Sequence, residues 1–166
     1  MNCTIFIKKQ HILDLQLDIT LATRQLLLKN LNSLSKEALF TIPQGCNNHI
    51  FWNIAHVVVT QQLLVYKLSG VPMLISDSLV DKYKKGTKPD GAVASDEEIE
   101  TIKTGLISCI EQTRKDHDNG AFNQFHPYET SAGVTLKSAA DAVSFNLFHE
   151  GIHLGSILAI KRMMAL

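Results

Sequence analysis

Apolar residues recur at three- and four-residue intervals through most of this chain, and this spacing constrains the fold more than any other feature. The first series predicts an amphipathic helix near 9–33. Its buried side is expected to consist of Ile12, Leu15, Ile19, Ala22 and Leu26. No segment shows the convincing apolar–polar alternation of a half-buried strand, and there is no internal repeat. The spacing therefore predicts an all-α protein.

Three further helices follow, separated by segments that carry glycine and proline. The second helix is expected to begin after a cap at Asn47 or Asn48 and to end at about Ser69. Residues 71–94 contain prolines and glycines around a lysine-rich centre, which is typical of a long crossover connection. One short helical turn is expected within this connection, near Asp77–Tyr83.

The third helix opens at a capping box, in which Ser95 is followed three residues later by Glu98. It is expected to end near Asp118, and a loop over 119–134 leads to a fourth helix that is capped by Thr135 and continues to the C-terminus. The buried stripe of the third helix is expected to be Ile99, Ile102, Leu106 and Ile110.

Four long helices in 166 residues fit one domain, 1–166, which is large enough to bury a core without disulfides or metal. The predicted fold class is an all-α four-helix bundle with long crossover connections. A pocket could form where the long connections cover one end of the bundle.

The charge balance restricts the partners. Sixteen basic residues match sixteen acidic ones, whereas general nucleic-acid and membrane-surface binders usually carry a basic excess, so a small neutral or mixed-charge molecule is expected instead. There is no apolar signal-peptide core and no run of about 18 apolar residues, so the expected location is cytoplasmic. Cys3, Cys46 and Cys109 have no C-x-x-C spacing and are expected to be free thiols.

The fourth helix contains the string His149-Glu150-Gly151-Ile152-His153. Residues four apart lie on one face of a helix, so the two imidazoles can converge on one metal ion. An H-E-x-x-H string would arise by chance only about 0.01 times in a chain of this composition. The string therefore predicts a metal site whose chemistry depends on its third ligand.

A third protein ligand has to come from upstream of the string. The segment after His153 contains no His, Asp, Glu or Cys, whereas the third ligand of a zincin protease usually lies downstream. His56 is the best candidate, because it stands within an apolar run of the second helix, where an unpaired imidazole would be costly to bury. The alternative is a core histidine that is hydrogen-bonded to a polar neighbour.

The other four histidines fit a metal site less well. His49 lies two turns before His56, roughly 10 Å along the helix axis, which is too far to share the ion through short side chains unless the helix begins irregularly. His117 ends the third helix, His126 lies in the following loop and His11 begins the first helix, so all three are expected at the surface.

Three segments resemble the DinB-like (DinB/YfiT) superfamily of metal-binding four-helix bundles. Residues 48–56, Asn-His-Ile-Phe-Trp-Asn-Ile-Ala-His, match its entry into the second helix, and Leu-Ser-Gly at 68–70 matches the exit. Residues 148–157, Phe-His-Glu-Gly-Ile-His-Leu-Gly-Ser-Ile, match its fourth helix.

This resemblance implies a three-histidine site in which His56, His149 and His153 bind nickel, zinc or a similar divalent ion. Family members of known activity join or isomerise small molecules with a low-molecular-weight thiol such as bacillithiol, mycothiol or glutathione. Dimers are frequent in the family, so a homodimer is expected. The resemblance implies no role in DNA synthesis or repair, in agreement with the neutral charge.

Three functions are consistent with such a site. A coordinated thiol would lose its proton and become a better nucleophile, which favours a metal-dependent thiol S-transferase as the first hypothesis. A coordinated water would instead suit a small zinc hydrolase with Glu150 as general base. The third hypothesis is a metal-binding or dimerisation module without turnover.

Four residues near the ligands complete the predicted site. Glu150 is offset about 100° around the helix from the first ligand histidine and is predicted to act in catalysis, with a salt-bridged or solvated carboxylate as the alternative. Asn53 and Thr60 lie one turn before and after His56, and with Tyr128 they are predicted to line the cofactor or substrate pocket. Core hydrogen bonds and a surface aromatic are the alternatives.

Two further features concern the surroundings of the site. Gly151 and Gly155 weaken the fourth helix by about 1 kcal/mol each, and close packing against another helix is the expected reason. Four lysines of the crossover are expected to form a solvated charged loop, although they could also attract the carboxylates of a thiol cofactor. They are Lys82, Lys84, Lys85 and Lys88.

Overall fold

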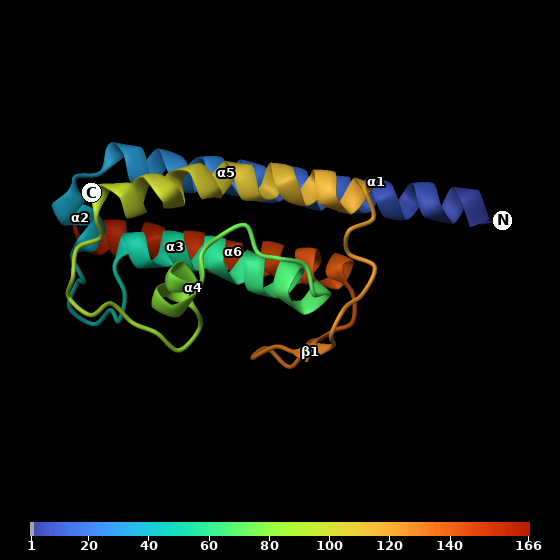
Figure 1. The fold of residues 1–166 in the computed structure, drawn as a ribbon. Helices are drawn as coiled ribbons and strands as arrows, with labels where there is room; N and C mark the ends of the chain where they lie inside the picture. Colours follow the sequence, from blue (N-terminus) through green and yellow to red (C-terminus); the bar gives the residue numbers. More distant parts are fainter. Residues whose placement is uncertain (1) are drawn as a thin grey trace.

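The computed structural model describes residues 2–166, with side chains from residue 13 onward. Four long helices form the body of the molecule (Figure 1). They are α1 (Asn2–Ser33), α3 (Ile50–Gln61), α5 (Asp96–Asp118) and α6 (Ala139–Met163). None of the helices in this described part is long and apolar enough to cross a lipid bilayer.

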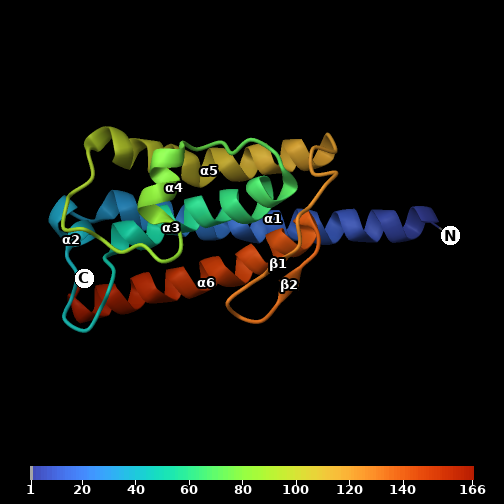
Figure 2. The ribbon, with the colours of Figure 1, turned by 60° about the horizontal axis from the view of Figure 1, so that its bottom comes forward.

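The helix directions follow from the connections. In Figures 1 and 2, α1 and α6 run in one direction, while α3 and α5 run in the other. Because α3 and α5 are parallel, the chain between them has to return along the length of the bundle, as the long crossover over 71–94 was predicted to do. The connection from α5 to α6 joins antiparallel helices and needs no such return.

The buried face of α1 differs from the prediction. Its core side chains are Leu13, Leu17, Leu27 and Leu31. Leu15, Ile19 and Leu26 are exposed instead, and Ala22 also faces solvent, while Ile12 lies outside the residues whose side chains are described. Both series satisfy helical spacing because α1 has apolar residues on opposite sides, and spacing alone does not distinguish them. The helix also begins earlier than residue 9.

The helix α3 begins at Ile50, and its cap is His49 rather than Asn47 or Asn48. The Trp52 N–H donates to Nδ1 of His49 at 2.9 Å, which satisfies one of the free donors of the first turn. The helical path continues to the predicted end through a π-helical turn, η1 (Gln62–Tyr66), and a 3-10 turn, η2 (Lys67–Ser69). Gly70 stops it with φ of +68°, a conformation that favours glycine.

The shorter elements are partly as predicted. The helix α4 (Asp77–Tyr83) has the predicted bounds, whereas α2 (Lys36–Phe40) was not predicted. Within the expected loop, β1 (Tyr128–Glu129) pairs antiparallel with β2 (Thr135–Leu136). Thr135 is therefore a strand residue, and Ser138 caps α6 by accepting from the Asp141 N–H at 3.1 Å.

The third long helix matches its prediction at both ends. Ser95 caps α5 by accepting from the Glu98 N–H at 3.1 Å, and α5 ends at Asp118. All four residues of its predicted stripe are buried. Ile99, Ile102 and Leu106 pack in one core cluster with the almost entirely buried α3, so the residues that hold His56 lie in the centre of the bundle.

Candidate metal centre

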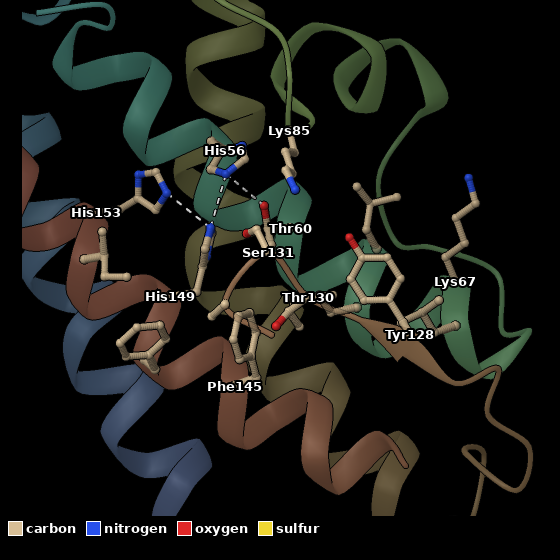
Figure 3. Close-up of a pocket in the computed structure, with 16 residues that line it drawn as sticks. His56, Thr60, Lys67, Lys85, Tyr128, Thr130, Ser131, Phe145, His149 and His153 are labelled. Atoms are coloured by element: carbon tan, nitrogen blue, oxygen red, sulfur yellow. Dashed lines mark hydrogen bonds between the residues drawn. The ribbon is translucent and has the colours of Figure 1, made fainter. Parts of the chain in front are cut away.

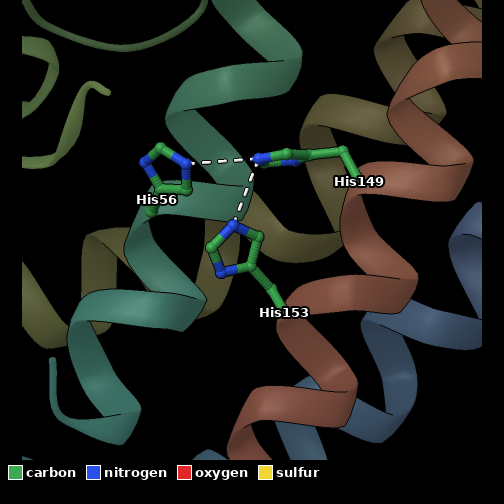
Figure 4. A group of neighbouring side chains, drawn as sticks. All are labelled: His56, His149 and His153. Carbon is green, nitrogen blue, oxygen red and sulfur yellow. Dashed lines mark hydrogen bonds between the residues drawn. The ribbon is translucent and has the colours of Figure 1, made fainter. Parts of the chain in front are cut away.

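The three predicted ligand histidines meet between two helices (Figure 4). His56 comes from the middle of α3, and His149 and His153 lie one turn apart on α6. Nε2 of His149 is 3.2 Å from Nε2 of His56 and 3.1 Å from Nε2 of His153. Atoms bound to one ion through bonds of about 2.0–2.1 Å are separated by about 3 Å. The cluster could therefore hold a metal ion.

A hydrogen bond at Nδ1 of His56, the ring nitrogen that points away from the cluster, determines the tautomer of this ring. Nδ1 lies 2.6 Å from the carbonyl oxygen of Tyr83. A carbonyl oxygen only accepts, so Nδ1 carries the hydrogen and donates it. In the neutral ring Nε2 then carries a lone pair, which points into the cluster.

A second chain of hydrogen bonds fixes His153 in the same way. The Asn53 amide nitrogen donates to the His49 carbonyl oxygen at 2.9 Å, which places the amide oxygen at 2.8 Å from Nδ1 of His153. Nδ1 of His153 is therefore the donor, and its Nε2 also carries a lone pair. Asn53 was predicted to line the pocket, but it is not among the lining residues; it orients the His153 ring from behind.

The cluster is suited to a cation. Burial lowers the pKa of His56, and burial followed by the charges of the neighbouring histidines lowers that of His149 to about 3. Burial and then His56 lower the pKa of His153 to about 4, so all three rings are neutral near pH 7. Nδ1 of His149 is buried and has no hydrogen-bond partner among the described residues. If Nε2 of His149 carried a hydrogen, it could donate to Nε2 of His56 or to Nε2 of His153, but not fully to both. A metal ion would instead accept a lone pair from each of the three Nε2 atoms.

Glu150 is turned away from this cluster, so the general-base prediction is not supported by the geometry. Its two oxygens accept from Nε and Nη2 of Arg24, each at 2.8 Å, and both side chains are 0 % exposed. The Asn146 amide also donates to Glu150 at 2.6 Å. The salt-bridged alternative is therefore the observed one, and Glu150 is not among the residues that line the adjoining pocket.

A cavity of about 580 Å³ adjoins the histidines (Figure 3). Thr60 lines it with its hydroxyl 3.2 Å from Nε2 of His56, and Tyr128 of β1 lines it as well. The apolar wall consists of Leu63, Leu64, Leu68, Phe145, Phe148 and Ile152. Reactants at the histidines would thus lie at one side of a largely apolar pocket.

The remaining histidines lie outside the cluster. His49 is buried as the cap of α3, and burial lowers its pKa to about 4. His126 is exposed and His117 is half-buried, while His11 lies outside the described side chains.

Sequence reasoning missed two residues around the site, namely Tyr83, which holds His56, and Arg24, which holds Glu150. The first acts through a backbone carbonyl, which leaves no residue-type signal. The second lies outside the predicted buried stripe of α1, and a shift of that stripe by two residues would have included it.

Comparison with protein families gives one match over most of the chain. The sequence model of the DinB superfamily matches residues 19–157, a range that contains all three clustered histidines. A search of curated proteins finds no match.

Proposed function

This chain belongs to the DinB superfamily, and we propose that it is a metal-dependent enzyme acting on small molecules, specifically a thiol S-transferase. Such an enzyme forms a carbon–sulfur bond between a small thiol and an electrophilic carbon, whose leaving group takes the former bonding electrons. The observation that carries the proposal is the convergence of three Nε2 atoms beside a cavity of small-molecule size.

His56, His149 and His153 would hold the ion, for which nickel and zinc are the proposed identities. A bound divalent ion would lower the pKa of a coordinated thiol and keep it as the nucleophilic thiolate. The Tyr83 carbonyl and the Asn53 amide hold two of the rings in the tautomer that ligation requires.

Other residues of the pocket would act on the reactants directly. The Thr60 hydroxyl lies beside His56 Nε2 and can hydrogen-bond to a thiolate or to a departing group. The apolar wall excludes water from the bound substrates, which strengthens electrostatic interactions at the ion. Tyr128 extends this wall from the β1–β2 hairpin.

A metal-dependent hydrolase with Glu150 as base is less well supported. A general base has to reach the attacking water at hydrogen-bond distance, and the carboxylate of Glu150 is already held by Arg24 and Asn146. No aspartate or glutamate lines the cavity in the described part of the chain.

The proposed function is tested by supplying bacillithiol, glutathione and simple alkyl thiols with a chromogenic electrophile, with and without zinc or nickel. We expect metal-dependent loss of the thiol, abolished in His56→Ala and retained in His126→Ala, which removes an exposed histidine. Absence of metal-dependent turnover with every thiol would overturn the proposal and favour a module without turnover.

We also propose that the protein forms a homodimer through α1 and α6, which pack against each other. Leu15, Ile19 and Leu26 of α1 are exposed, as are Phe148 and Ile152 of α6. Gly151 and Gly155, predicted to pack against another helix, face open space instead. These exposed apolar side chains on two copies would be covered in a two-fold dimer through the two helices.

Light scattering coupled to gel filtration tests the dimer. Leu26→Glu combined with Ile152→Glu should yield monomers, while Val134→Glu, at an exposed position of the hairpin, should leave the dimer intact. A monomeric wild-type protein would contradict this proposal.

A further inference from the structure

The charge of the pocket differs from that of the whole protein. The chain carries equal numbers of basic and acidic residues. The cavity beside the histidines is lined by two lysines, Lys67 and Lys85, and by no aspartate or glutamate of the described chain. With its histidines neutral, the pocket therefore carries two positive charges.

These two lysines lack direct acidic partners, unlike their neighbours. Lys82 pairs with Glu98 at 2.6 Å, and Lys84 pairs with Asp81 at 2.7 Å. Neither Lys67 nor Lys85 forms an ion pair with any residue whose side chain is described. The pKa of Asp81 is lowered first by its hydrogen bond to Lys84 and the charge of Lys84, and the charge of Lys67 is the last contribution. The charges at the pocket are thus available to a ligand.

The two lysines line the same cavity as the histidines, and they come from different elements. In Figure 3 the three histidines lie at one side and Lys67 at the other, with Lys85 and Tyr128 between them. Lys67 comes from η2, the continuation of the helix that carries His56, and Lys85 follows α4. The apolar wall lines the same cavity.

We propose that this pocket selects a small ligand with an apolar body and a carboxylate, which Lys67 and Lys85 bind while the other end of the ligand extends toward the histidines. A cavity of about 580 Å³ accommodates a molecule of this kind. This inference deepens the proposed function by naming the substrate class. It rests on that function only in assuming that the reaction takes place at the three histidines.

Anion selection can be measured without any reaction. The probes are octanoate, 1-octanol and octylammonium, which share one apolar chain, titrated calorimetrically into the full protein with and without zinc. We expect octanoate to bind about tenfold more tightly than 1-octanol, since two partly exposed ion pairs contribute on this order, and octylammonium to bind least. Equal affinities for octanoate and 1-octanol in the metal-free protein would overturn the proposal.

Paired variants separate pocket charge from total charge. Lys67→Met with Lys85→Met should abolish the preference for octanoate, whereas Lys29→Met with Lys137→Met removes the same charge from exposed positions outside the pocket and should preserve it. Lys67→Glu with Lys85→Glu should reverse the preference toward octylammonium. Equal effects of the two methionine pairs would refute selection by the pocket.

The outcome is independent of catalysis. A protein that prefers octanoate but shows no metal-dependent turnover would disprove the transferase alone. A protein that turns over thiols but does not discriminate octanoate from 1-octanol would disprove the anion site alone.

Discussion

Replacement of Glu150 by glutamine tests whether this residue stabilises the fold or performs catalysis. Glutamine has nearly the same shape, so the exchange removes the negative charge and leaves the Arg24 guanidinium buried without its counter-ion. Both side chains are fully buried, and Arg24 makes two hydrogen bonds of 2.8 Å to the carboxylate.

The expected loss can be derived from this geometry. Removing one partner of a buried ion pair typically costs about 3–5 kcal/mol, because the other charge remains desolvated. A domain of this size is stabilised by about 5–15 kcal/mol in total, and each kcal/mol shifts its melting temperature by about 2–4 °C. We therefore expect Glu150→Gln to melt roughly 6–20 °C below the wild type.

Thermal and urea unfolding followed by circular dichroism measure this loss. Glu111→Gln is the matched control, because Glu111 is an exposed glutamate of α5. Replacing both partners, Arg24→Met with Glu150→Met, should recover much of the loss, since no buried charge is then left unpaired.

Two results would refute this reasoning. The first is a Glu150→Gln protein as stable as Glu111→Gln, which would mean that the ion pair does not contribute. The second is unchanged stability with abolished turnover, which would restore Glu150 as a general base.

Three further predictions concern the histidine cluster. Burial lowers the pKa of His149 to about 3 and of His153 to about 4, so on acidification the unfolded metal-free chain binds protons at these histidines before the folded protein does. The free energy of unfolding of the metal-free protein, measured by urea titration, should therefore decrease as the pH is lowered from about 6.5 to 4. An increase over this range would contradict the burial of neutral rings. Asn53→Leu removes the acceptor of His153 and should weaken zinc affinity about 10- to 100-fold in a chelator competition, while unchanged affinity would show that this hydrogen bond is dispensable. Thr60→Val should reduce thiol turnover and leave the zinc content unchanged; full activity would exclude its hydroxyl from the reaction.

Local signals predicted the parts of the fold that local chemistry determines. The capping box at Ser95 predicted the start of α5, and apolar spacing predicted its buried stripe. The apolar run around His56 identified the histidine that joins the cluster from a second helix. The spacing of His149 and His153 placed both rings on one face of α6.

Features that depend on distant parts of the chain were not predictable in this way. The buried face of α1 depends on which of two apolar stripes meets the bundle, and that choice places Arg24 against a residue 126 positions away. The Tyr83 carbonyl reaches His56 because α4 packs against α3. The β1–β2 hairpin has strands of two residues each, too short for an alternation pattern.

The central claim is that His56, His149 and His153 bind one divalent ion together. The most direct test is the metal content of tag-free protein after equilibration with zinc or nickel and removal of free metal, measured by mass spectrometry beside circular dichroism spectra. About one ion per chain is expected in the wild type and in His126→Ala, and loss is expected in each folded alanine variant of the three histidines. Full retention of the metal in His56→Ala, or a folded wild-type protein that binds none, would contradict the three-histidine centre.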